Sequence, residues 1–305
     1  MSSAQQSLTA GPPASVKRPW QWSGRRHLHA GEATWAIAFV APYAAVFLAF
    51  AVYPIAYALW MGSKPSLYAE LIDDPIYLKT VVNTFLFAGL GVNLQLLLAL
   101  LLSGFFMRRR WWIKALLFIY MVPWALPAVQ AFTSVHWILI SEMGLVNRLL
   151  QELFNIDGPM WFNNRWLALG VNIAAYIWKW MPFWTVIFIA GRMIIPKELH
   201  EAAEIDGATG SRRFVHITLP LLANLYLVCT LLSTIWAIGE FNTVFFVSNG
   251  SPTMSTEVLA TLGFRYTFDG VKAELGVAAM LSALPVLFPI VIMLIRRIQT
   301  REVQL

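Results

Sequence analysis

Six long apolar stretches constrain this chain more than any other feature of its sequence. About 20 apolar residues in an α-helix cross a hydrocarbon core of ~30 Å. Backbone groups in lipid must satisfy their own hydrogen bonds, so helices are the expected form. The six stretches are Trp35–Trp60, Val81–Phe106, Ile113–Ile140, Trp166–Ile194, Leu221–Val247 and Leu275–Ile295. The sequence therefore predicts an all-α polytopic membrane protein with six transmembrane helices.

The composition excludes an ordinary soluble domain. Only 12% of the residues are charged and 58% are hydrophobic, whereas a soluble domain has roughly 25% charged residues. Cys229 is the single cysteine, which excludes a disulfide framework and a cysteine-based metal site. Prolines within the apolar stretches predict kinks, which membrane helices tolerate. These prolines are Pro42, Pro54, Pro123, Pro127, Pro182, Pro285 and Pro289.

The basic residues predict the orientation of the six helices. Cytoplasmic segments of membrane proteins carry an excess of lysine and arginine. One set of segments (the two termini and the second–third and fourth–fifth connections) holds 15 of the 22 basic residues, and the opposite set holds six. The 15 are Lys17, Arg18, Arg25, Arg26, Arg108, Arg109, Arg110, Lys114, Arg192, Lys197, Arg212, Arg213, Arg296, Arg297 and Arg301. We therefore expect both termini in the cytoplasm, and we attribute the net charge of +6 to this rule and not to nucleic-acid binding.

The termini and one internal loop complete the expected domain organisation. Residues 1–34 are polar and rich in Pro, Gly and Ser, without the apolar region of a signal peptide. They predict a disordered cytoplasmic tail. We expect a six-helix permease domain at 35–297, with a cytoplasmic loop at 196–220, and a short cytoplasmic tail at 298–305.

The loop between the fourth and fifth apolar stretches is unusually polar and ordered in its pattern. It reads ELHEAAEIDGATGSRRFVHITLP from Glu198 to Pro220. Pro196 is suited to begin a helix, because proline has no N–H to leave unpaired in the first turn. Gly207 then suits a chain reversal, because glycine adopts positive φ without penalty. The residues allow two interpretations, namely a solvated loop or a helix–turn–helix that docks into a partner protein.

The same residues carry a family resemblance. They match, at each fixed position, the pattern E-A-A, three residues, G, nine residues, I-x-L-P. The matching residues are Glu201, Ala202, Ala203, Gly207, Ile217, Leu219 and Pro220. The chain thus resembles the permeases of binding-protein-dependent ABC importers, whose "EAA" motif this is. Residues 178–199 and 241–268 resemble the carbohydrate (maltose-F-like) branch of that family.

The resemblance implies a fold, partners and a mechanism. It implies the type I ABC importer permease fold in a bacterial inner membrane. It also implies a second homologous permease subunit, two cytoplasmic ATPase subunits that hold ATP and Mg²⁺, and an extracytoplasmic solute-binding protein. Contact with the ATPase is assigned to Glu201, Ala202, Ala203, Asp206, Gly207, Ile217, Leu219 and Pro220. The chain contains no G-x-x-x-x-G-K-[ST] motif, so we expect it to be no enzyme and to bind no cofactor of its own.

A few polar residues within the apolar stretches are candidates for the solute path, because polar groups inside membranes are functional by default. Carboxylates and amides bind sugar hydroxyls, and aromatic faces cover the C–H side of the ring. The candidates are Glu240, Asn242, Trp236, Gln95 and Gln130. Hydrogen bonding between helices is the alternative role. We interpret Lys179 as a structural residue that pairs within the bundle, and His136 as interfacial.

Two segments that we expect outside the membrane have recognisable local features. Asn249 stands where the family usually has glycine, and asparagine tolerates left-handed geometry. The loop Ser141–Asn164 is expected to contain a short helix.

A sugar, oligosaccharide or polyol is the expected solute, with glycerol phosphate as the alternative. An ion-coupled secondary transporter is disfavoured by the lack of a clear inverted repeat, and a membrane-embedded enzyme by the lack of a catalytic or metal-binding cluster.

Overall fold

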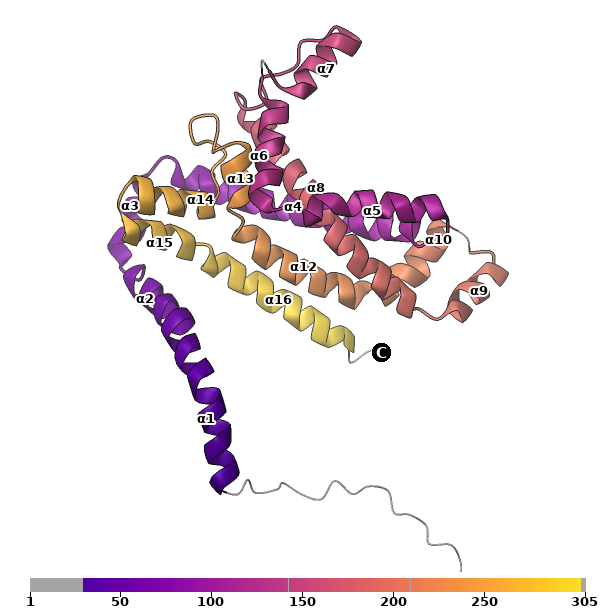
Figure 1. The fold of residues 1–305 in the computed structure, drawn as a ribbon, viewed down its shortest axis with the longest axis horizontal. Helices are drawn as coiled ribbons and strands as arrows, with labels where there is room; N and C mark the ends of the chain where they lie inside the picture. The colour runs from indigo at the N-terminus through magenta and orange to yellow at the C-terminus, as the bar shows by residue number, and fades with distance from the viewer. Residues whose placement is uncertain (1–29, 142, 209, 303–305) are drawn as a thin grey trace, which may run out of the picture. The chain divides into compact units, whose positions relative to one another are not determined.

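The computed structural model describes residues 30–141, 143–208 and 210–302, and every regular element in these ranges is helical (Figure 1). The chain divides into two compact units, residues 1–55 and 56–305. Most of the predicted N-terminal tail lies outside the described residues. Its last part, from Ala30 onwards, is helical.

The first unit contributes one apolar helix. It consists of α1 (Ala30–Phe47), the π-helical segment η1 (Leu48–Val52) and the start of α2 (Tyr53–Met61). The stretch Thr34–Met61 has a mean hydropathy of 2.1 and no charged residue. Its length of 28 residues suffices to cross a membrane.

Two 30-residue helices, α4 (Tyr77–Phe106) and α8 (Arg165–Ile194), form the centre of the second unit. They pack against each other, and α12 (Ala223–Ile238) packs on α4. Phe87 and Leu96 of α4 are fully buried, as is Phe188 of α8. A helix of this length spans about 45 Å, which exceeds the hydrocarbon core.

Shorter helices surround this centre. In Figure 1, α9 and α10 lie at one end of the unit, and α3 and α14 lie at the other. The remaining elements are α3 (Pro65–Asp73), α5 (Trp111–Ala125), α6 (Ala128–Leu139), α7 (Leu145–Phe154), α9 (Lys197–Ile205), α10 (Ser211–Arg213), η2 (Phe214–Thr218), α11 (Leu219–Leu221), α13 (Asn242–Val247), α14 (Leu259–Phe264), η3 (Arg265–Asp269), α15 (Ala273–Leu281) and α16 (Leu284–Glu302).

The third predicted span is not one helix. The stretch Ile113–Ile140 is divided into α5 and α6, which meet at an angle of 99°. Leu126, the residue before Pro127, is extended with ψ 143°. A proline disfavours the α conformation at the residue before it and removes one N–H from the helix, which favours a break here.

The fifth predicted span, Leu221–Val247, is also interrupted. The segment Ser211–Leu221 meets α12 at 68°, and α12 ends at Ile238. Gly239, Glu240 and Phe241 then separate α12 from α13. The break has a local cause, because the Glu240 carboxylate accepts hydrogen bonds from the first turn of α13.

The other spans lie near their predicted positions. They cover Thr34–Met61, Tyr77–Phe106, Arg165–Ile194 and Ala273–Thr300. These four helices are long and apolar enough to cross a membrane, and counting each bent pair as one span gives six. The last helix continues to Glu302, so it includes part of the predicted C-terminal tail.

Candidate functional site

A cavity of about 360 Å³ lies between α8, α12 and the break after α12. Two of the predicted path residues, Trp236 and Glu240, line it together with Gly239. Tyr176 and Trp180 of α8 complete its polar and aromatic lining. The sequence analysis did not single out these two residues as path residues. Their spacing of four places them on one face of a helix, which was the available signal.

Glu240 supplies the acidic group of this cavity. Its side chain is largely buried. Oε1 accepts hydrogen bonds from the backbone N–H of Thr243 at 2.9 Å and from the Thr243 hydroxyl at 3.0 Å. The carboxylate therefore caps α13 with one oxygen. This leaves the other oxygen to accept hydrogen bonds from a bound molecule.

Aromatic rings surround Trp236. The ring centroids of Trp184, Phe183 and Trp180 lie 5.6, 6.0 and 6.4 Å from that of Trp236. The indole N–H of Trp180 is buried and has no hydrogen-bond partner among the described residues. A buried donor without a partner is costly unless a ligand or water satisfies it. The cavity thus combines an acceptor, a free donor and aromatic faces, the groups that bind a polyhydroxylated molecule.

Gln95 lies beside this cavity without lining it. Its side-chain amide donates to the Ser233 hydroxyl at 2.5 Å and links α4 to α12. Its carbonyl oxygen is buried and unpartnered within the described part of the chain. Gln95 therefore fits the alternative role of helix–helix hydrogen bonding, with acceptor capacity left over.

The structure does not bring the other two path candidates into the cavity. Asn242 is the first residue of α13 and is half-buried, but it does not line the cavity. Gln130 is exposed on α6, and its backbone carbonyl accepts a hydrogen bond from Ser134. These two residues do not share a site with Glu240 and Trp236 in this structure.

Lys179 is fixed by the break between α5 and α6. Its ammonium group donates to the backbone carbonyls of Pro123 at 2.9 Å and Leu126 at 2.6 Å. These carbonyls lose their helical partners where α5 ends. The structural interpretation of Lys179 agrees with this geometry. His136 likewise has a structural contact, because its Nδ1 lies 2.7 Å from the Val247 carbonyl oxygen.

The loop after α13 is held by a buried ion pair. Glu257 is fully buried, and its Oε1 lies 2.6 Å from Nε of Arg265. Arg265 also donates to the Asn249 side chain at 2.8 Å. Asn249 has φ 51°, which is the left-handed geometry that the sequence predicts. Burial and a hydrogen bond to Asp74 raise the pKa of Tyr266, so its hydroxyl remains a donor that ties η3 to the segment before α4.

The segment predicted to dock on a partner forms a helix and a turn. Pro196 precedes α9 as its N-cap residue, and Glu198 lies in the first turn. Ala203 is buried, whereas Glu201 and Ala202 are exposed. Ile205 is 88% exposed. The helix therefore exposes Glu201, Ala202 and Ile205.

Gly207 closes this helix as predicted. Its φ is +75°. The Ala208 N–H donates to the Ala203 carbonyl at 2.8 Å, and the Gly207 N–H donates to the Glu204 carbonyl at 3.1 Å. These two bonds define a Schellman motif, in which glycine occupies the left-handed position. The predicted chain reversal is therefore confirmed.

The second half of the segment joins the membrane helices at an angle. Ile217 is half-buried, and Leu219 and Pro220 are exposed. α11 ends at Leu221, and the chain bends before α12. Pro220 therefore lies in α11, the short helix before this bend.

The described residues contain no group of three or more His, Cys, Asp or Glu side chains that could hold a metal ion. Two regions are candidate binding surfaces. They are the Glu240 cavity, which we call the aromatic cavity, and the exposed loop at 196–220, which we call the α9 loop.

Comparison with known proteins identifies relatives of this chain. A family model described as "Binding-protein-dependent transport system inner membrane component" matches residues 95–304. The sulfoquinovosyl glycerol transport system permease of Agrobacterium fabrum is 30% identical over 91% of this chain and 94% of its own length. The trehalose/maltose transport system permease of Thermococcus litoralis is 27% identical over 80% of this chain and 86% of its own length.

Solved structures share the fold. A chain of a bacterial ABC transporter that imports the acidic polysaccharide alginate superposes with a TM-score of 0.77 and 21% identity. The superposition covers 88% of this chain and 96% of that one. The structure of a bacterial alginate transporter in complex with its alginate pentasaccharide-bound periplasmic protein gives a TM-score of 0.74 at 22% identity, over 86% of this chain and 93% of that one.

Proposed function

Because this chain belongs to the family of inner membrane components of binding-protein-dependent transport systems, we propose that it forms half of the translocation path of an ATP-driven importer for a sugar, oligosaccharide or polyol. The chain is a multi-pass permease of the carbohydrate branch of the ABC importers. The solute class, the coupling surface and the orientation are the parts of the proposal.

The aromatic cavity is the observation that carries the solute class. Its lining offers the Glu240 carboxylate, the free Trp180 N–H and the faces of Trp180 and Trp236. Sugars present hydroxyl groups for the first two and a C–H face for the rings. We infer that a sugar, oligosaccharide or polyol passes this cavity.

The relatives point to the same class. Their names assign sulfoquinovosyl glycerol to one and trehalose or maltose to another. Glycerol phosphate, the alternative from sequence, is disfavoured by charge. The cavity lining contains an acidic residue and no lysine or arginine, so it offers no cationic partner to a phosphate group.

We assign coupling to the α9 loop. Its exposed Glu201, Ala202 and Ile205 form the surface offered to a partner, and the rigid turn at Gly207 fixes their direction. The chain lacks a phosphate-binding motif, so the proposal places ATP and Mg²⁺ in two separate ATPase subunits. A second permease subunit and an extracytoplasmic solute-binding protein complete the proposed assembly. The distribution of lysine and arginine supports a cytoplasmic location for both termini and the loop.

The test begins with the complete transporter. The chain is co-expressed with the second permease, the ATPase and the binding protein of its transporter, and the complex is purified and reconstituted in proteoliposomes. The binding protein is first screened by thermal shift against mono- and oligosaccharides, polyols and glycerol phosphate. The best ligand then serves as the transport substrate.

The expected result is uptake that needs internal ATP, stops with vanadate and persists with an ionophore. A transporter driven by an ion gradient shows the opposite pattern, and that result overturns the proposed energy source. Binding and uptake of glycerol phosphate with no response to any sugar or polyol overturns the proposed solute class.

A further inference from the structure

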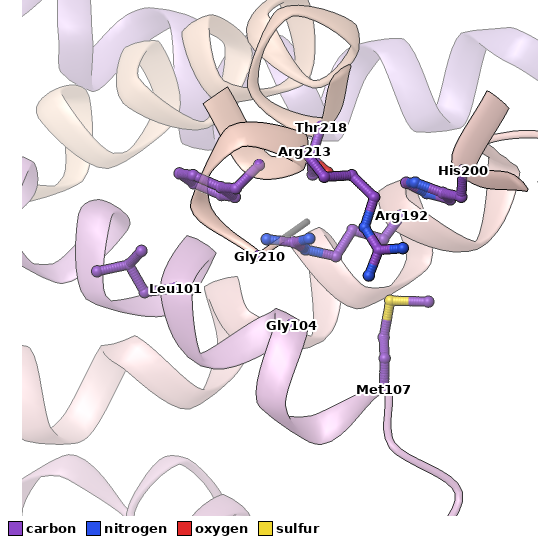
Figure 2. Close-up of a pocket in the computed structure, with 9 residues that line it drawn as sticks. Leu101, Gly104, Met107, Arg192, His200, Gly210, Arg213 and Thr218 are labelled. Atoms are coloured by element: carbon purple, nitrogen blue, oxygen red, sulfur yellow. The ribbon is translucent and has the colours of Figure 1, made fainter. Parts of the chain in front are cut away.

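A second cavity, of about 410 Å³, lies where the ends of α4 and α8 meet the α9 loop. It shares no lining residue with the aromatic cavity. Arg192, Arg213 and His200 line it from three different elements, and Figure 2 shows both guanidinium groups facing the same space. We call it the basic cavity.

Arg192 places a positive charge in this cavity, and its hydrogen-bond partners are neutral groups. Its Nε donates to the Ser103 hydroxyl at 2.7 Å, and its Nη2 donates to the Leu100 carbonyl at 3.0 Å. The guanidinium also lies 5.5 Å from the ring centroid of Phe214. Among the described residues, no carboxylate pairs with Arg192. Its charge is therefore uncompensated.

Arg213 and His200 add further donors. Arg213 forms an ion pair with Glu204, whose side chain is 59% exposed. The guanidinium of arginine has five N–H donors, so this pair leaves donors for a second acceptor. Nδ1 of His200 is buried without a hydrogen-bond partner in the part of the chain that the structure describes. Two arginines that face one space repel each other, and an anion between them removes that cost.

The floor of the cavity is glycine. A Cβ at Gly104 would lie 3.5 Å from Cζ of Arg192, in ordinary contact with the guanidinium. A longer side chain at this position would extend over the guanidinium and fill the space. The small residue thus keeps the donors of Arg192 accessible.

Apart from Thr218 and the glycines, the rest of the lining is apolar. Leu101 and Met107 are 50% and 41% exposed at the end of α4, next to the exposed Arg108, Arg109 and Arg110. Cationic groups beside exposed apolar side chains at the end of a membrane span fit an amphiphile with an anionic head. We propose that the basic cavity binds a phosphate group, supplied by the headgroup of an anionic phospholipid. The proposal depends only on this cavity and is independent of the solute that the transporter carries.

The experiment measures lipid binding to the purified full-length permease in its complex, by native mass spectrometry in a non-ionic detergent. Phosphatidylglycerol and phosphatidylcholine with the same acyl chains are titrated separately. We expect tighter binding of phosphatidylglycerol. Arg213→Gln removes a charged donor, and charge-assisted hydrogen bonds are about twice as strong as neutral ones. Gly104→Leu fills the space over the Arg192 guanidinium. Each substitution should weaken that binding roughly tenfold. Arg212→Gln is the matched control, because Arg212 is exposed and does not line the cavity.

A soluble source of phosphate is tested in the same preparation. Inorganic phosphate is added to lipid-depleted complex, and the unfolding temperature is measured for the wild type and Arg213→Gln. A rise only in the wild type, without a preference for phosphatidylglycerol, supports the phosphate site and assigns it to a soluble ligand. Equal binding of the two lipids with no effect of phosphate overturns the proposal, as does phosphatidylglycerol binding that neither Arg213→Gln nor Gly104→Leu weakens.

Discussion

At the scale of single residues, Gly207 has a conformation that few other residues can adopt. At φ +75° it forms the left-handed end of α9. Nothing lies within 4 Å of a Cβ placed there, so any effect of a side chain is conformational and not steric. A substitution at Gly207 therefore changes the backbone geometry of the α9 loop and leaves the exposed side chains of α9 as they are. The coupling proposal can thus be tested at one position.

Gly207→Val is expected to uncouple transport from ATP hydrolysis. A β-branched residue in the left-handed region costs on the order of 1–3 kcal/mol, and the loop relieves that strain by changing the direction of α9. Solute-stimulated ATPase activity of the reconstituted complex should fall by about tenfold or more. Gly207→Asn is the control, because asparagine tolerates this geometry. Wild-type stimulation by an assembled Gly207→Val complex would contradict the docking role.

Trp236 and Glu240 make the solute path testable in the same way. Trp236→Ala removes an aromatic face, and Glu240→Gln removes the charge but keeps an oxygen to cap α13. Each should raise the KM for the transported sugar roughly tenfold, because a lost hydrogen bond or ring contact in such a site costs about 1–2 kcal/mol. Trp178→Ala is the control, since Trp178 is exposed on α8 and does not line the cavity. Unchanged KM values for both variants would remove the aromatic cavity from the path.

At the scale of elements, the sequence predicts features that depend on neighbouring residues. It does not predict features that depend on contacts between segments far apart in the chain. The spans follow from the lengths of apolar runs, and the Gly207 turn follows from the conformational freedom of one residue. The prolines predicted kinks in the third span, but not the contact of the 99° bend with Lys179, which is far along the chain. The aromatic cavity depends on α8 facing α12, so Tyr176 and Trp180 could not be joined to Trp236 before the packing was known.

Lys179→Met is expected to destabilise the bend between α5 and α6. The substitution keeps the length of the side chain but removes the donor that satisfies the carbonyls of Pro123 and Leu126. Hydrogen bonds from a charged group contribute about 1.5–3 kcal/mol, so we expect a loss of about 2 kcal/mol and a lower unfolding temperature in detergent. Lys79→Met is the control, because Lys79 is exposed on α4. If both variants unfold at the wild-type temperature, Lys179 does not hold the bend.

At the scale of the whole molecule, the basic residues are distributed unevenly between the segments that connect the helices. In the second unit, the α9 loop and the α3–α14 region lie at opposite ends (Figure 1). The basic residues gather in the connections that include the α9 loop, and the segment with α7 has few. From the positive-inside rule we expect the α9 loop and the basic cavity at the cytoplasmic surface, and α7 outside.

This orientation can be measured with one cysteine at a time. Cys229 is the only native cysteine and is buried, so a Cys229→Ala background adds no label of its own. Asp157→Cys, in the exposed segment after α7, should react with a membrane-impermeant maleimide in spheroplasts. Glu201→Cys, on the exposed surface of α9, should react only after the membrane is opened, and co-expression of the ATPase subunit should protect it because the subunit covers α9. Labelling of Glu201→Cys in sealed spheroplasts would reverse the proposed orientation, and labelling unaffected by the ATPase would separate α9 from that contact.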